Sequence, residues 1–241
     1  MTRRFYSSTS IQPPRTEISG TEAHHMLHVL RLEVGDRVTL FDGSGVEYTA
    51  RIEHISRQKV QCTIEDQQAI DRELGVEIHL AVALPKGDRS RWLVEKAVEL
   101  GVRRLVPLEC ERSIVRIRPA SLSRLKKAVI EASKQCGRNR LMELSSPVSF
   151  SEWFHEEQGD GLRLLAHPDQ TARPLQSIDA CHQGDTVRIA IGPEGGFSES
   201  EVRAAATQDW KVVTLGNRLL RVETSALAAV AAIGLWAHTA E

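Results

Sequence analysis

The spacing of apolar residues changes character near residue 75. Upstream, short stretches are rich in β-branched residues and alternate with a period of two, which is typical of strands with one buried face. These strands are predicted at 37–41, 46–55 and 59–64. The turn sequence DGSG at 42–45 joins the first two, and the segment 21–31 has helical spacing with Thr21 as N-cap. The first part of the chain is predicted to form a small β-barrel.

Downstream, buried strands and helices alternate along the chain. Strands are predicted at 76–84, 104–108, 162–166, 186–191 and 211–215, and helices at 90–100, 121–135, 151–157, 198–207 and 223–237. The polar stretch 65–74 shows no clear strand pattern and is predicted to be a linker. Repeated strand–helix alternation indicates an α/β domain with a parallel sheet. We therefore predict two domains, 1–70 and 75–241.

Composition is that of a folded protein, with 41% hydrophobic and 26% charged residues among 241. The longest apolar run, 226–237, is shorter than the ~20 residues of a membrane span; it is predicted to lie in the core or in a dimer interface. No apolar segment follows the basic N-terminus, so we predict a cytoplasmic protein without a secretory signal. The four cysteines are widely separated and form no CxxC pair, so no metal site is expected.

Positive charge is concentrated in one segment. Residues 86–140 contain 15 Lys or Arg and 6 Asp or Glu, a net charge of +9, whereas residues 141–241 carry −7. Such a block can be a solvated helix face, but here the cations also recur in loop-like stretches, which favours a surface that binds a polyanion. The candidate RNA-binding residues are Lys86, Arg89, Arg91, Arg138, Asn139 and Arg140.

Unusual loops follow the three late strands. The sequence GPEGG at 192–196 follows the strand 186–191, and glycines there let a backbone approach a ligand closely. An ordinary strand-to-helix turn is the alternative for this motif alone. Neither GxxxxGK[ST] nor a GxGxxG after the first strand is present, so a P-loop and a dinucleotide site are not predicted. In open parallel sheets, ligands bind beyond the carboxyl ends of the strands, which is where these loops lie.

Four motifs together resemble one family. LPKGDRSRWLVEKAVELGV (84–102), EASKQCGRNR (131–140), IGPEGGFSESEV (191–202) and LGNRLLRVETSALAAV (215–230) are similar to the ribosomal RNA small-subunit methyltransferase E family of the SPOUT superfamily. The segment HHMLHVLRLEVGD, within residues 1–70, resembles the PUA-like barrel of that family. The resemblance implies a deep C-terminal trefoil knot, S-adenosylmethionine as cofactor, a homodimer, and methylation of N3 of a uridine in 16S ribosomal RNA.

The resemblance also implies a set of site residues. Adenine is expected at the backbone of Leu215 and Leu220, and the rest of the cofactor at the loop 192–196 and the turn 221–226. The residues expected to bind the cofactor are His167, Ile191, Gly192, Pro193, Glu194, Gly195, Gly196, Leu215, Gly216, Leu220, Thr224 and Ala226. Since the cofactor supplies the methyl group, the reaction needs no metal.

Arg221 and Glu223 are the candidate catalytic residues. Uracil N3 must lose its proton before it attacks the methyl group, and an arginine can stabilise the negative charge that develops on O2 and O4. An ion pair between Arg221 and Glu223 that only holds the loop is the alternative. Two other functions stay open: a non-catalytic RNA-binding protein, and a SPOUT methyltransferase that acts on transfer RNA or on a ribose 2′-OH.

Overall fold

A computed structural model describes residues 3–156, 160–168, 172–178 and 182–236. Contacts within the chain divide it into two compact units. The first is Met1–Glu73 together with Ser133–Leu141, and the second is Leu74–Ala132 together with Met142–Glu241. The boundary at Glu73 lies within the predicted linker, but the segment 133–141 belongs to the first unit although it lies in the middle of the second along the chain. Glu157, Ala237, Asp169 and Cys181 lie outside the described residues.

The first unit is a five-stranded sheet with a short helical segment. Its strands, in spatial order, are β1 (Arg4–Tyr6), β3 (Arg37–Phe41), β4 (Val46–Ile55), β5 (Lys59–Ala69) and β2 (Arg15–Ser19). The segment predicted as one helix begins one residue earlier, as α1 (Gly20–His24), and continues as a π-helical stretch, η1 (His25–Val29). Phe5, Met26, Leu40 and Ile52 are fully buried between the sheet and this helix.

The predicted linker at 65–74 is partly wrong, because β5 continues through Ala69. Its last residues pair with β4, with Tyr48 opposite Gln67 and Val46 opposite Ala69. The side chains from Glu65 to Ala69 are exposed. A strand without a buried face has no apolar alternation, so the backbone pairing that defines it leaves no pattern in the sequence.

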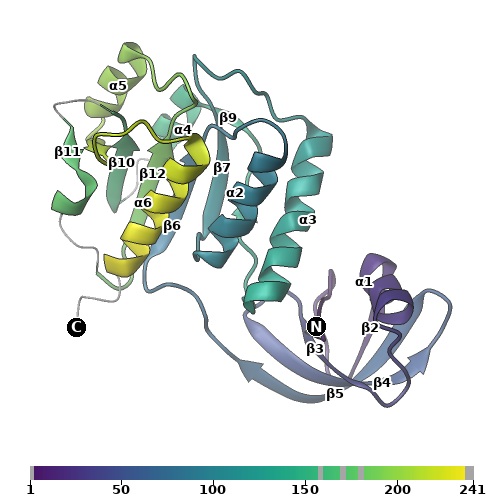
Figure 1. The fold of residues 1–241 in the computed structure, drawn as a ribbon. Helices are drawn as coiled ribbons and strands as arrows, with labels where there is room; N and C mark the ends of the chain where they lie inside the picture. Colours follow the sequence, from purple (N-terminus) through teal and green to yellow (C-terminus); the bar gives the residue numbers. More distant parts are fainter. Residues whose placement is uncertain (1–2, 157–159, 169–171, 179–181, 237–241) are drawn as a thin grey trace. The chain divides into compact units, whose positions relative to one another are not determined.

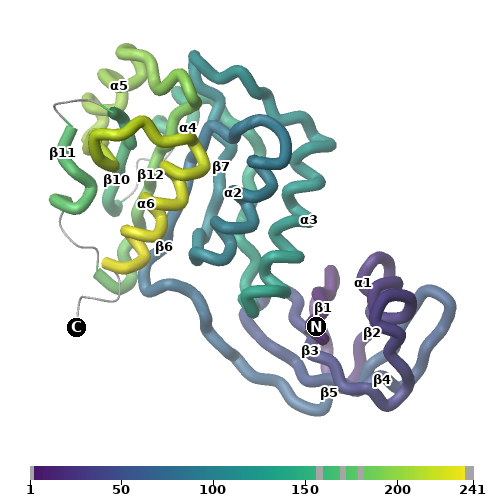
Figure 2. Tube along the Cα trace, viewed as in Figure 1, coloured from purple at the N-terminus to yellow at the C-terminus, as the bar shows by residue number. Residues whose placement is uncertain are grey.

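The second unit is an eight-stranded sheet whose recorded pairings are all parallel. Its order is β11 (Arg173–Pro174), β13 (Lys211–Thr214), β10 (Leu162–Ala166), β12 (Thr186–Ile191), β6 (Glu77–Val82), β7 (Arg104–Glu109) and β8 (Glu143–Leu144), with β9 (Val148–Ser149) also paired to β7. The α/β class with a parallel sheet is thereby confirmed. Figure 2 follows the chain through this unit, in which β12 lies between β10 and β6.

Helices cover both faces of the parallel sheet. On one face, α2 (Asp88–Glu99) and α6 (Val222–Trp236) contact each other, and α6 lies on β6 and β12 (Figure 1). On the other, α4 (Phe150–Glu156) and α5 (Glu199–Ala206) join a buried aromatic cluster that includes Trp153 and Trp210. The remaining helix, α3 (Pro119–Cys136), ends in the segment that belongs to the first unit.

The predicted start of α5 is confirmed in detail. Ser198 is the N-cap: its Oγ accepts from the backbone N–H of Glu201 at 3.2 Å, and its own N–H donates to Glu201 Oε2 at 2.8 Å. This capping box satisfies the backbone N–H groups of both residues at once. It fixes the point at which the GPEGG loop becomes a helix. Among the described residues, no helix is long and apolar enough to cross a membrane.

Candidate functional site

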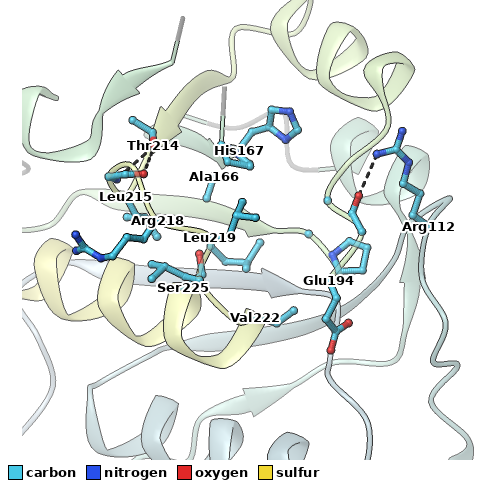
Figure 3. Close-up of a pocket in the computed structure, with 18 residues that line it drawn as sticks. Arg112, Ala166, His167, Glu194, Thr214, Leu215, Arg218, Leu219, Val222 and Ser225 are labelled. Atoms are coloured by element: carbon cyan, nitrogen blue, oxygen red, sulfur yellow. Dashed lines mark hydrogen bonds between the residues drawn. The ribbon is translucent and has the colours of Figure 1, made fainter. Parts of the chain in front are cut away.

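A cavity of about 350 Å³ opens at the carboxyl edge of three adjacent strands, β13, β10 and β12. Its wall is built from the three loops that follow those strands (Figure 3). The strands are parallel and neighbours, so their carboxyl ends meet at the same edge. The cavity therefore gathers residues that lie far apart in the sequence, from Arg112 to Ser225, as expected for ligand sites in open parallel sheets.

Most of the residues expected to bind the cofactor line this cavity. They are His167, Ile191, Gly192, Pro193, Glu194, Gly195, Gly196, Leu215, Gly216 and Leu220. Thr224 and Ala226 do not line it; Ala226 is fully buried in α6. The catalytic candidates Arg221 and Glu223 also lie outside the lining, although Leu220 and Val222 on either side of Arg221 belong to it.

Two lining residues, Val222 and Ser225, lie in the turn 221–226 that was expected to contact the cofactor, although neither was named individually. The other lining residues that were not named from the sequence are Arg112, Ala166, Pro168, Thr214, Arg218 and Leu219. Most are direct neighbours of expected residues in the same loops, so wider margins around the motifs would have included them. Arg112 is different, because it enters from the connection between β7 and α3 and no local pattern places it here.

Glycine is needed at two points of the GPEGG loop. A Cβ at Gly192 would lie 3.1 Å from the ring of Phe197, which is tighter than ordinary packing. Gly196 has φ +68°, in the left-handed region that favours glycine. The loop thus presents backbone groups rather than side chains to the cavity.

Arg112 holds this loop from outside. Its Nη1 donates to the carbonyl oxygen of Gly195 at 3.0 Å and to that of Phe197 at 3.3 Å (Figure 3 shows the reach of Arg112). Two hydrogen bonds from one guanidinium to carbonyl groups two residues apart restrict the backbone of the loop. The cavity wall is therefore tied to the connection that follows β7.

Arg89 joins two acidic residues of the site. Its Nη2 lies 3.4 Å from Glu194 Oε1, and its Nη1 lies 3.4 Å from Glu223 Oε1. The Glu223 side chain is 9% exposed, and Oε2 is buried without a hydrogen-bond partner among the described residues. Arg89 therefore links the GPEGG loop to the start of α6, so this candidate RNA contact already has two carboxylate partners.

Arg221 is exposed and precedes α6. Its carbonyl oxygen accepts from the N–H of Ser225 at 2.8 Å, which closes the first turn of the helix. No ion pair joins Arg221 to Glu223 in the described part of the chain, since Glu223 pairs with Arg89 instead. The alternative of an Arg221–Glu223 clamp therefore finds no support in this geometry.

The remaining RNA-binding candidates fall into two groups. Lys86, Arg91 and Arg140 are exposed, and Arg91 pairs along α2 with Glu95 at 2.7 Å. Arg138 and Asn139 are only 3% and 2% exposed. Their side chains bind within the first unit, so we withdraw the expectation that these two contact RNA.

No group of three or more His, Cys, Asp or Glu side chains suited to a metal ion occurs among the residues that the structure describes. Burial raises the pKa of the Cys62 thiol to about 11 and, with the Glu201 carboxylate as a smaller cause, that of Cys110 to about 12. Both thiols are protonated at neutral pH and unsuited to nucleophilic attack.

Comparisons with known proteins agree with this arrangement. A family model described as an RNA methyltransferase domain matches residues 72–234, and one described as an RNA methyltransferase PUA domain matches residues 18–65. The chain is 30% identical to ribosomal RNA small subunit methyltransferase E of Bacillus subtilis, over 97% of this chain and 96% of that protein. It is 28% identical to the Rickettsia conorii protein of the same name, over 97% and 95%.

Solved structures are similar over nearly the whole chain. A Legionella pneumophila protein described as a methyltransferase, in complex with S-adenosylmethionine, has a TM-score of 0.90 and 34% identity, with 98% of each chain covered. Ribosomal RNA small subunit methyltransferase E from Neisseria gonorrhoeae, bound to S-adenosylmethionine, has a TM-score of 0.90 and 31% identity with the same coverage. The chain thus belongs to the ribosomal RNA small subunit methyltransferase E family.

Proposed function

We propose that this protein transfers a methyl group from S-adenosylmethionine to N3 of a uridine in 16S ribosomal RNA. The observation that carries the proposal is the cavity at the carboxyl edge of β13, β10 and β12, in a chain whose solved relatives hold S-adenosylmethionine. The expected cofactor residues gather there from three separate loops. A binding protein with a degenerate pocket would not need all three.

The cavity suits the proposed cofactor in size and chemistry. Its volume of about 350 Å³ lies in the range of small-molecule sites, roughly 300–1,000 Å³. Backbone groups of Leu215 and Leu220 are proposed to hold the adenine, and the loop 192–196 the ribose and methionine parts. His167 Nδ1 is buried without a hydrogen-bond partner among the described residues, so it is available to a polar group of a ligand. When bound, S-adenosylmethionine supplies an electrophilic sulfonium methyl group.

Arg221 is proposed to act on the uracil ring. As N3 gives up its proton to water, negative charge spreads over O2 and O4, and a guanidinium beside them lowers the energy of that charge. The loops that would hold S-adenosylmethionine would present its methyl group to N3, and this alignment of the two substrates would account for much of the acceleration. Glu223 is proposed to assist through position, because it holds Arg89, and Arg89 reaches Glu194 in the cavity wall.

Three further features belong to this proposal: a homodimer, a C-terminal trefoil knot and RNA binding by the first unit. Exposed apolar side chains support the dimer. Trp92 on α2 is 46% exposed, Leu235 on α6 is 67% exposed, and these two helices pack together. Leu219, in the cavity wall, is 88% exposed. A second copy that covered such residues would complete the site, and sedimentation equilibrium tests this; a fully active monomer would reject the dimer.

The function itself is tested by nucleoside analysis. RNA of the small ribosomal subunit is treated with protein and S-adenosylmethionine, digested and examined by mass spectrometry, while cofactor binding is measured by titration calorimetry. We expect 3-methyluridine and a saturable cofactor site. A methylated ribose, or a methylated transfer RNA in place of ribosomal RNA, would replace the proposal by another SPOUT activity. Absence of cofactor binding would favour the non-catalytic RNA-binding protein.

A further inference from the structure

A second cavity lies beside the proposed cofactor site, within the second unit. Its volume is about 520 Å³, and it is bounded by the turn after β6, the connection between β7 and α3, and the first half of α3. We call it the basic groove. It shares no lining residue with the cofactor cavity, and the proposed chemistry does not use it.

The groove combines an apolar surface with cations. Val115, Ile117 and Leu125 contribute apolar surface, and Arg116, Arg124 and Lys127 contribute positive charge. Asp88 and Glu131 also line it, as does Arg91, which pairs with Glu95 on its own helix. With four cations and two carboxylates, the lining has a net positive charge.

Three of these cations have no carboxylate partner. Among the residues that the structure describes, no ion pair or hydrogen bond engages the exposed side chains of Arg116, Arg124 or Lys127. Most other arginines of the basic segment are held by acidic residues: Arg89 by Glu194 and Glu223, and Arg138 by Glu73. Unpaired cations along a groove fit the backbone of single-stranded nucleic acid, because its phosphates take up their charge.

The groove is placed next to the reaction that we propose. β12, β6 and β7 are consecutive in the sheet, so the loops at their carboxyl ends follow one another along one edge. The connection from β7 to α3 reaches both cavities, because Arg112 lines the cofactor cavity and Arg116 lines the groove. Figure 1 shows this connection passing over the same end of the sheet as the start of α6.

We infer that the basic groove binds a single-stranded segment of the substrate RNA that adjoins the target uridine. Phosphates of that segment contact Arg116, Arg124 and Lys127, and a base lies against the half-buried Val115 and Ile117. The inference rests on the proposed function for the identity of the target. It adds residues that hold the RNA, in a place that the motifs did not single out.

The test compares two triple variants that carry equal charge changes. Arg116→Ala/Arg124→Ala/Lys127→Ala removes the groove cations, and Arg173→Ala/Arg203→Ala/Lys211→Ala removes three exposed cations elsewhere in the second unit. Binding of fluorescein-labelled oligouridine is measured by anisotropy over a range of salt concentrations. Each lost phosphate contact reduces the magnitude of the negative slope of log affinity against log salt by about 0.7, so the slope of the groove variant should be less steep by about two units. The control should keep the wild-type slope.

Titration with S-adenosylmethionine separates this result from folding and from the proposed function. The groove variant should bind the cofactor as the wild type does, and the single variant Arg124→Glu should weaken oligouridine binding in the same direction. An unchanged slope in the groove variant overturns the inference. So does a groove variant that binds oligouridine normally but no longer binds small ribosomal subunits, because a ribosomal protein is then the partner. If the salt slope differs between the wild type and the groove variant but the wild type makes no methylated nucleoside, the groove is still an RNA-binding site and the proposed function is rejected.

Discussion

Two groups of basic residues differ in whether the structure gives them acidic partners. The segment 133–141 belongs to the first unit, and its two buried cations are held by acidic residues: Lys134 pairs with Glu22 at 2.9 Å, and Arg138 with Glu73, whereas Arg140 is exposed. At the carboxyl edge of the second unit, Arg116, Arg124 and Arg221 are exposed and have no carboxylate partner among the described residues. Positive charge in a sequence is thus available to a ligand only where the fold leaves it without a counter-charge.

The first region is a junction inside the first unit. Asn139 adds two hydrogen bonds to the Arg138–Glu73 pair. Its Nδ2 donates to the carbonyl of Ile70 at 3.0 Å, and its Oδ1 accepts from Arg4. Arg72 Nη1 donates to the carbonyl of Gly137 at 2.8 Å. These contacts satisfy polar groups that would otherwise be buried and unpaired. They explain why a stretch from the middle of the second unit's sequence folds with the first.

Arg138→Ala is expected to have the largest effect on stability. It removes one partner of a buried ion pair and leaves Glu73 without its counter-charge, which costs about 3–5 kcal/mol. Thermal and urea unfolding of the first unit would show the loss. Arg140→Ala, two residues along and exposed, is the matched control and should change stability by less than about 0.5 kcal/mol. Equal stability of the two variants would contradict the division between held and open arginines.

Arg221→Ala is expected to change chemistry instead of stability. Loss of a group that stabilises developing charge lowers turnover by about 10²–10³-fold, while the unfolding midpoint and the affinity for S-adenosylmethionine stay near those of the wild type. Single-turnover methylation at saturating cofactor gives the first quantity, and calorimetry gives the second. Arg221→Lys should recover part of the rate, because it keeps the charge but not the planar fork. Impaired cofactor binding with a normal saturated rate would reject the catalytic role.

Glu47→Gln tests the held arginines through pH. Burial raises the pKa of the Glu47 carboxyl, but hydrogen bonds and charge from Arg4 and Arg72 outweigh it and hold the pKa below its ordinary value. The carboxylate therefore adds stability above about pH 4.5, and this contribution disappears as the pH falls and the group is protonated.

At neutral pH the Glu47→Gln variant should be about 1–2 kcal/mol less stable than the wild type, and the two should converge as the pH falls below the lowered pKa of Glu47. Urea unfolding at several pH values measures this. Glu65→Gln is the control, because Glu65 pairs with the exposed residues Arg37 and Arg51, and ion pairs open to solvent contribute little to stability. If the difference in the free energy of unfolding between wild type and Glu47→Gln persists in acid, packing and not the charge of Glu47 accounts for the stability of its contacts with Arg4 and Arg72.

Arg89→Ala is expected to give the smallest change. Its two pairs are long at 3.4 Å, and its side chain is 41% exposed, so the link from Glu194 to Glu223 contributes about 1 kcal/mol or less. Cofactor affinity should fall by no more than about five-fold, whereas Arg91→Ala on the same helix should leave it unchanged. A loss of turnover at saturating cofactor, with unchanged affinity, would instead place Arg89 on the substrate RNA.

Much of the second unit could be predicted from the sequence. Strands β10 and β12 begin and end at the predicted residues, and the capping box at Ser198 and Glu201 is present. Such features depend on neighbouring residues, because a strand buried on both faces needs a continuous apolar run and a helix start needs its cap. The three loops with unusual sequences were also found, since glycine is required where the backbone turns at Gly196 or packs closely at Gly192.

Tertiary structure decided what local patterns do not encode. The sheet order places β12 between β10 and β6 and so brings the three loops together. Tertiary contacts also bring Arg112 to the carbonyl groups of Gly195 and Phe197 and, within the first unit, pair Arg138 with Glu73. Arg124 has no acidic partner among the described residues. The sequence by itself determined the elements and the positions of the charges. Which charges are neutralised depends on residues up to 134 positions apart, as in the Arg89–Glu223 pair, because an ion pair is set by distance in space and not by spacing along the chain.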